Sequence, residues 1–111
     1  MEITHRTLKR VDLVTVNGRV DSSAAPDLAA TLRSINDASR FRIVLDMTGL
    51  EYISSAGLGV LVTTLKNCRR YNRGNLLLAS VPDRIAGVLE LAGLAPLFEA
   101  FPDAVTAVGS F

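Results

Sequence analysis

Two short, unbroken apolar runs separated by one long helical pattern constrain the fold of this chain more than any other feature of its sequence. The runs are FRIVLDM (41–47) and NLLLASV (75–81), and each has the length of a β-strand that is covered on both faces. Between them, apolar residues recur at helical spacing from about Ser55 to Tyr71. Neighbouring parallel strands need such a helical crossover, which is nearly always right-handed. The pattern therefore predicts an α/β fold with a mostly parallel sheet.

The remaining segments extend this unit on both sides. The expected elements are strands at 2–8, 11–16, 41–47 and 75–81, a short strand near Leu97 and Phe98, and helices at 25–38, 55–71, from Pro82 to near Gly93, and from Pro102 onward. We expect Asn17-Gly18 to end the second strand, 48–54 to form a loop, and Gly74 to stop the long helix in the left-handed conformation. Ser22 or Ser23 is expected to cap the first helix.

Residues 1–111 are thus predicted to form a single domain, since the chain is too short for two. The predicted architecture is α/β, with a mostly parallel sheet of four to five strands, an antiparallel edge strand and about four helices. In open parallel sheets, functional residues gather in the loops beyond the carboxyl ends of the strands. Three loops meet this condition, at 18–23, 46–57 and 80–83.

The composition excludes several classes of partner. The 12 basic and 11 acidic side chains leave a formal net charge of +1, which gives no overall attraction to nucleic acid or an acidic membrane. No apolar run approaches the roughly 20 residues that cross a bilayer, and MEITHRTLKR lacks the apolar core of a signal peptide. Cys68 is the only cysteine, so no internal disulfide can form. We expect a cytoplasmic protein with no direct nucleic acid or membrane partner; the sequence says little about its oligomeric state.

Few side chains could support catalysis or metal binding. His5, the only histidine, falls on an expected edge strand, and Cys68 falls in the apolar stripe of a helix, so no metal site is predicted. A phospho-aspartate receiver built on Asp46 would need further acids, of which Asp21 is only one, and a lysine after a later strand that the chain lacks. No glycine-rich nucleotide-binding motif is present, and no cofactor is predicted.

Basic side chains cluster around the end of the long helix, at Lys66, Arg69, Arg70 and Arg73. We interpret them as a solvated face that suits the negative end of the helix dipole. The alternative is that they form part of a protein-binding surface.

The serine pair in EYISSAGLGVLV (51–62) allows two interpretations. A serine just before a helix accepts a hydrogen bond from a backbone N–H one turn further on, which contributes about 1 kcal/mol. The same position suits a regulatory phosphate, because a helix N-terminus has free N–H groups and a partial positive charge. Local chemistry alone leaves both interpretations open for Ser54 and Ser55.

At these residues the sequence resembles the STAS domain family, in particular the bacterial anti-sigma factor antagonists. VLDMTGLEYISSAGLGVLV resembles the family signature, an apolar strand ending in Asp followed by Asp-Ser-Ser/Thr/Ala-Gly-Leu at a helix start. VNGRVDSSAAPDLAATL and NLLLASVPDRIAGVLELAGLAPLF resemble its flanking stretches, so the resemblance covers nearly the whole chain.

The resemblance implies a binding protein rather than an enzyme. Such a protein binds an anti-sigma factor that is also a serine kinase and so frees a sigma factor. The kinase then phosphorylates one serine, and a serine phosphatase resets the switch. ATP belongs to the kinase.

The resemblance also assigns residues. Alignment on Gly57-Leu58-Gly59 places the phosphoacceptor on Ser55, with Ser54 where relatives usually carry Asp and with Ala56 where they carry Ser or Thr. Ser54 is therefore the alternative phosphorylation site. The implied partner-binding residues are Asp21, Ser22, Ser54, Ser55, Ala56, Gly57 and Leu58.

Two other hypotheses differ in their consequences. A STAS-domain scaffold, or a sensory or ligand-binding module in a partner-switching pathway, would keep the fold without direct control of a sigma factor. A small hydrolase would use Ser54 or Ser55 as a nucleophile, and it would need His5 nearby as a base.

Overall fold

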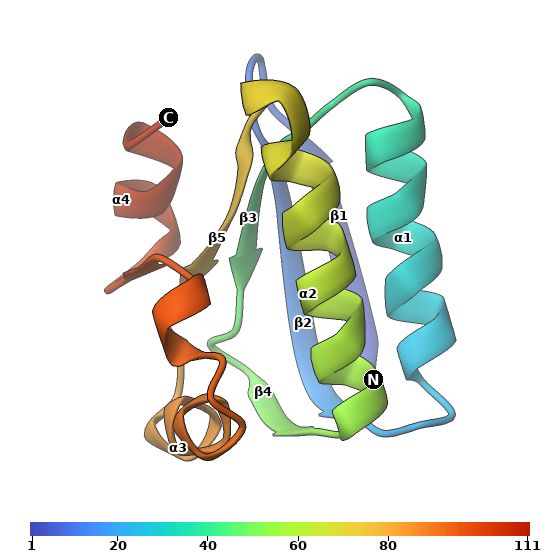
Figure 1. The fold of residues 1–111 in the computed structure, drawn as a ribbon, viewed down its shortest axis with the longest axis vertical. Helices are drawn as coiled ribbons and strands as arrows, with labels where there is room; N and C mark the ends of the chain where they lie inside the picture. Colours follow the sequence, from blue (N-terminus) through green and yellow to red (C-terminus); the bar gives the residue numbers. More distant parts are fainter.

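A single six-stranded sheet organises the computed structural model, which describes all residues 1–111 (Figure 1). The strand order is β1-β2-β3-β5-β6, and β4 pairs with β2 beside this path. Only β1 and β2 pair antiparallel, as predicted for the first strand, and every other pair is parallel. The strands are β1 (Glu2–Thr7), β2 (Asp12–Val20), β3 (Arg42–Asp46), β4 (Leu50–Ile53), β5 (Asn75–Ala79) and β6 (Ala100–Phe101).

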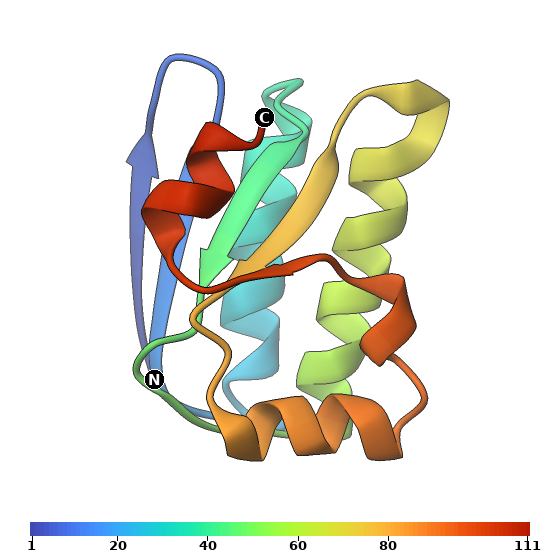
Figure 2. The ribbon, with the colours of Figure 1, turned by 90° about the vertical axis from the view of Figure 1, so that its left-hand side faces the viewer.

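Four α-helices cover the sheet, in agreement with the predicted number. They are α1 (Ala25–Asp37), α2 (Ser55–Arg69), α3 (Asp83–Leu91) and α4 (Ala104–Gly109). Figure 2 shows α1 and α2 on one face and the short α4 on the other, while α3 lies across the end of the sheet near β4. The main core of 21 buried residues lies under α1 and α2, because Val14, Val16 and Val20 of β2 and one stripe of each helix are apolar.

The expected loop at 48–54 is wrong in part, because Leu50–Ile53 forms β4. Leu50 and Ile53 are buried, whereas Glu51 and Tyr52 between them are exposed. This segment pairs with residues 18–20 of β2, so β2 does not end at Asn17-Gly18 as predicted but continues through a register shift to Val20. The sheet thereby gains a sixth strand, beyond the four to five expected.

The end of α2 also differs from the prediction. The helix stops at Arg69 and passes into a 3-10 turn, Arg70–Asn72. The left-handed residues are Tyr71 (φ 58°) and Asn72 (φ 56°), not Gly74. Glycine is needed at position 74 for a different reason, since a Cβ there would lie 2.0 Å from the carbonyl oxygen of Phe41.

The last elements of the chain, from Ala95 onward, differ from their predicted positions. The expected strand near Leu97 and Phe98 is a 3-10 turn, Ala95–Leu97, and the last strand comes later as β6. The last helix begins at Ala104 rather than at Pro102, because Asp103 caps it by accepting a hydrogen bond from the backbone N–H of Thr106 at 2.7 Å.

Candidate functional site

Two of the predicted functional loops meet at one end of the sheet. The backbone N–H of Ser54 donates to the carbonyl oxygen of Val20 at 2.8 Å, which continues the parallel pairing of β2 and β4. Asp21 follows Val20, and Ser55 follows Ser54, so both residues leave adjacent strands at the same edge. Figure 1 shows this edge at the bottom, where the starts of α1 and α2 lie together.

Ser54 is the N-cap of α2. Its backbone is extended (φ −80°, ψ 170°), and its hydroxyl oxygen accepts a hydrogen bond from the N–H of Gly57 at 3.1 Å. Its carbonyl oxygen accepts the next helical hydrogen bond, from the N–H of Leu58 at 2.9 Å. This hydroxyl therefore performs the capping role that the sequence left open between two serines.

Ser55 occupies the first helical position and is free of this role. Its side chain is exposed, and none of the side-chain hydrogen bonds in the protein involves its hydroxyl. Ala56 beside it is exposed as well, and the first turn contains no acidic side chain. A first turn also leaves backbone N–H groups without intrahelical acceptors. The surroundings of Ser55 can therefore accommodate an added negative charge.

Gly57 and Leu58, two of the predicted partner-binding residues, lie in the interior. Leu58 exposes only 9% of its surface and belongs to the main core. A Cβ on Gly57 would lie 2.7 Å from Cγ1 of Ile53 and 3.0 Å from Cγ1 of Val20. Glycine here lets α2 approach β2 and β4 closely, so both residues position the loop from the interior.

Asp21 organises the neighbouring loop. Its Oδ1 accepts hydrogen bonds from the hydroxyl of Ser23 at 2.7 Å and from the N–H groups of Ala24 at 2.9 Å and Ser23 at 3.1 Å. These bonds, led by the one from the Ser23 hydroxyl, lower the pKa of Asp21 below its usual value. The predicted serine cap of α1 is wrong: the N-cap residue is Ala24, without a side-chain cap, and Asp21 binds the loop N–H groups instead. Ser22 is exposed.

Arg19 and Tyr52 form an exposed pair at this end of the sheet that was not predicted. They are partners in the β2–β4 register, and the guanidinium carbon of Arg19 lies 4.4 Å from the centre of the Tyr52 ring. Tyr52 is 38% exposed. The sequence contains no clear signal for this pair, because 50–53 does not alternate: Glu51 and Tyr52 are both exposed between the buried Leu50 and Ile53.

A shallow groove between α1 and α2 starts beside Ala56, at the end of the sheet where the two serine-containing loops meet. It has a volume of about 320 Å³, and Ala56 lines it together with Gly59 and Val60 on the α2 side. Across from them lie residues of α1, including Ala29 and Arg33. The exposed surface around Ser55 therefore continues along both helices.

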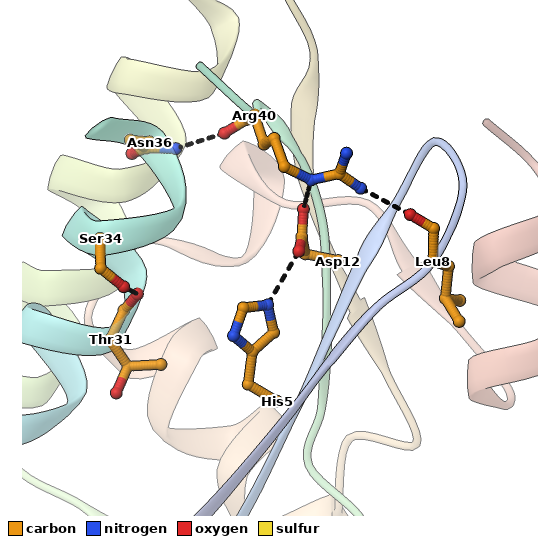
Figure 3. Close-up of polar contacts among 7 residues, drawn as sticks. All are labelled: His5, Leu8, Asp12, Thr31, Ser34, Asn36 and Arg40. Carbon is orange, nitrogen blue, oxygen red and sulfur yellow. Dashed lines mark hydrogen bonds and ion pairs between the residues drawn. The ribbon is translucent and has the colours of Figure 1, made fainter. Parts of the chain in front are cut away.

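The single histidine lies far from these serines. Nε2 of His5 is 2.8 Å from Oδ1 of Asp12, and Nε of Arg40 donates to Oδ2 of the same carboxylate (Figure 3). Asp12 begins β2 and Val20 ends it, so eight strand steps, or about 26 Å, separate this cluster from the Ser54 loop. No Ser–His–Asp arrangement can form, and His5 is a satisfied structural histidine. Asp12, which is 1% exposed, was missed as its partner.

Cys68 and Arg69, near the end of α2, have contacts within the fold, whereas Lys66 and Arg70 are exposed. Cys68 is fully buried, and burial raises the pKa of its thiol. Nε of Arg69 donates to Oδ1 of Asn75 at 3.0 Å, and its Nη2 donates to the carbonyl oxygen of Leu97 at 2.9 Å. No group of three or more His, Cys, Asp or Glu side chains could hold a metal ion. None of the helices has the length and apolarity that crossing a membrane requires.

Comparison with known proteins adds independent information. The family model described as STAS domain matches residues 2–107. A Bordetella bronchiseptica protein named as anti-sigma factor antagonist BtrV is 33% identical over 98 residues, which cover 88% of this chain and 84% of the relative. The anti-sigma-B factor antagonist of Listeria monocytogenes is 29% identical over 99 residues, which cover 89% of this chain and 85% of the relative.

Solved structures share the fold. The phosphorylated form of the Bacillus cell fate determinant SpoIIAA superposes with a TM-score of 0.76 at 14% identity, covering 98% of both chains. At this identity the match bears on the fold, and it agrees with the six-stranded sheet and its four helices.

Proposed function

This chain belongs to the STAS domain family, and we propose that it is an anti-sigma factor antagonist whose binding is switched by phosphorylation of Ser55. One observation carries the choice of serine. The hydroxyl of Ser54 is engaged in capping α2, whereas the adjacent hydroxyl of Ser55 is exposed and unbonded. A kinase can therefore reach Ser55 without breaking a hydrogen bond of the fold.

In its unphosphorylated form the protein binds an anti-sigma factor that is also a serine kinase, and so releases a sigma factor. The kinase supplies ATP and transfers its phosphate to Ser55, and a serine phosphatase later removes it. The chain is in this proposal a substrate and a binding partner, not an enzyme. The names of its relatives as anti-sigma factor antagonists support this assignment.

The proposed partner surface consists of the exposed residues around the two meeting loops. It includes Asp21, Ser22, Ser55 and Ala56, together with the Arg19–Tyr52 pair. Tyrosine and arginine are, with tryptophan, the side chains that most often dominate binding energy at protein interfaces. Ser54, Gly57 and Leu58 support this surface from below through the cap and the core.

Phosphorylation would break the interface by electrostatics and desolvation. A phosphoserine adds a charge of about −1.5 to −2, and the helix N-terminus tolerates that charge in the free protein. In the complex, the same group would have to be desolvated where a small hydroxyl had fitted. Asp21, a carboxylate that is ionised at neutral pH, adds negative charge to the same surface. The fold persists while the complex dissociates.

The test combines mass spectrometry with binding measurements. The protein is incubated with ATP and each serine-kinase anti-sigma factor of its own genome, and the phosphorylated residue is mapped. We expect Ser55→Ala to bind the kinase but to incorporate no phosphate, and Ser55→Asp to weaken binding at least tenfold. Ser54→Ala is the matched control, which should still be phosphorylated at residue 55.

Other outcomes would correct the proposal. Phosphate incorporation into Ser55→Ala would move the site to Ser54. If no cognate kinase modifies either serine, the switch is wrong, and a scaffold or sensory role for the same fold becomes the better hypothesis.

A further inference from the structure

The end of the sheet opposite the serine loops contains a hollow lined mainly by arginine. Its volume is about 200 Å³, and its lining residues are Arg10, Ser39, Arg40, Phe41, Arg42 and Arg73. They come from three connections, β1–β2, α1–β3 and α2–β5, and from Arg42 at the start of β3; Figure 1 shows these connections together at the top. No acidic side chain lines the hollow. The near-neutral net charge of the chain therefore hides a local concentration of positive charge.

Most of this charge is uncompensated. The protein has two ion pairs, and both use Asp12, which His5 and Arg40 share. Arg10, Arg42 and Arg73 have no carboxylate within ion-pair distance. Asp37, the last residue of α1, is exposed and pairs with none of them. Three guanidinium groups thus remain available to an anion.

Two of the four arginines are held in place before any ligand arrives. Arg40 donates from Nε to Asp12 and from Nη2 to the carbonyl oxygen of Leu8 at 2.7 Å (Figure 3). Arg73 lies over the Phe41 ring, 3.6 Å from its centre. A guanidinium group has five N–H donors, and these contacts leave the donors of Nη1 free in both residues. Fixed donors lose little conformational entropy when a ligand binds.

The hydrogen bonds of Arg73 also reduce the electrostatic repulsion that the C-terminal end of α2 would exert on a bound anion. Its Nη2 donates to the carbonyl oxygen of Asn67 at 2.6 Å, and its Nε donates to that of Arg70 at 3.0 Å. Carbonyl oxygens at a helix C-terminus carry partial negative charge, which would otherwise repel an anion. The positive charge of Arg73 offsets them at the rim of the hollow.

We propose that this hollow is a binding site for a phosphate group, on a small molecule or on a lipid headgroup. Arginine is well suited to phosphate because its planar fork matches two phosphate oxygens at once. Arg40 and Arg73 form the fixed wall of the site, and the exposed Arg10 and Arg42 close on the ligand. The site is remote from Ser55 and does not depend on the proposed switch.

The test is a titration of the ¹⁵N-labelled protein with pyrophosphate at low ionic strength. We expect saturable NMR shifts for the amides of residues 39–42 and 73. Arg10→Gln and Arg42→Gln should each weaken binding about fivefold or more, because each removes a charge-assisted hydrogen-bond donor. Both side chains are exposed, and neither takes part in an ion pair or a side-chain hydrogen bond, so these variants keep the fold.

Arg84→Gln is the matched control, since it removes an exposed arginine from α3 at the opposite end. Equal weakening in Arg84→Gln would show general charge screening and overturn the proposal. A second arm measures cosedimentation with phosphatidylcholine vesicles that contain or lack phosphatidic acid. Sedimentation that needs both phosphatidic acid and Arg42, without saturable pyrophosphate binding, would identify a lipid headgroup as the source. The proposal would be overturned if Arg42→Gln changed neither pyrophosphate binding nor cosedimentation with the vesicles.

Discussion

At the scale of single residues, two adjacent serines of the same chemistry have different roles because of where the helix begins. Ser54 has the extended backbone of an N-cap, so its hydroxyl is directed to the N–H of Gly57. Ser55 already has helical geometry, and its hydroxyl projects into solvent. One residue of displacement along the chain thus separates a structural hydroxyl from an accessible one.

This difference predicts unequal effects on stability. Ser54→Ala should lower the free energy of unfolding by about 1 kcal/mol, because the N–H of Gly57 loses its acceptor. Ser55→Ala should change it by less than about 0.5 kcal/mol, as expected for an exposed position without contacts. Urea denaturation of both variants measures the difference. Equal losses would mean that Ser55 shares the capping role.

At the scale of secondary structure, the close approach of α2 to the sheet depends on one glycine of two. Both Gly57 and Gly59 lie in the first turns of α2, but a Cβ on Gly59 meets no atom within 4 Å. At Gly57 the same atom would collide with Ile53 and Val20. Packing therefore requires glycine at position 57 but not at position 59.

The two glycines provide a matched pair of substitutions. Gly57→Ala should destabilise the protein by about 1–3 kcal/mol, because β-branched side chains of β2 and β4 must move. Gly59→Ala should stabilise it by up to about 1 kcal/mol through helix propensity. Thermal unfolding followed by circular dichroism would compare them. A stabilised Gly57→Ala variant would contradict the packing described for α2.

At the scale of the whole molecule, the two ends of the sheet differ in the residues that they expose. The carboxyl end of β2 and β4 carries the serine loops and Asp21, and the other end carries the arginine-lined hollow. Asp12, the first residue of β2, links β1 to the α1–β3 connection at that second end, because it binds His5 of β1 and Arg40 of the connection. The buried carboxylate of Asp12 thus connects the β1–β2 hairpin to the segment that follows α1.

Replacement of Arg40 tests the contribution of its ion pair with Asp12 to stability. Arg40→Met should lower the free energy of unfolding by about 2–4 kcal/mol, because the carboxylate of Asp12 is 1% exposed and would keep only His5 as a partner. Arg42→Met, at an exposed neighbour without ion pairs, should cost less than about 0.5 kcal/mol. Chemical denaturation of the two variants separates these outcomes. Similar decreases in the free energy of unfolding would mean that removal of positive charge, rather than loss of the Arg40–Asp12 ion pair, causes the effect.

The sequence by itself determined the α/β class, the antiparallel first strand, the four helices and the family. These follow from local periodicity and from a contiguous motif, both of which are readable along the chain. The short strand β4 was not predictable in this way. Its four residues form a strand because Val20 and its neighbours offer free backbone groups beside them.

Only the tertiary structure decided which predicted site residues are accessible. Gly57 and Leu58 look equivalent to Ser55 and Ala56 in the motif, but the turn of the helix directs the first pair into the core. The tertiary structure also brought Arg10, Arg42 and Arg73 together, although up to 63 positions separate them along the chain. Helix and strand periods are local properties, whereas burial and convergence depend on what the rest of the chain places opposite each residue.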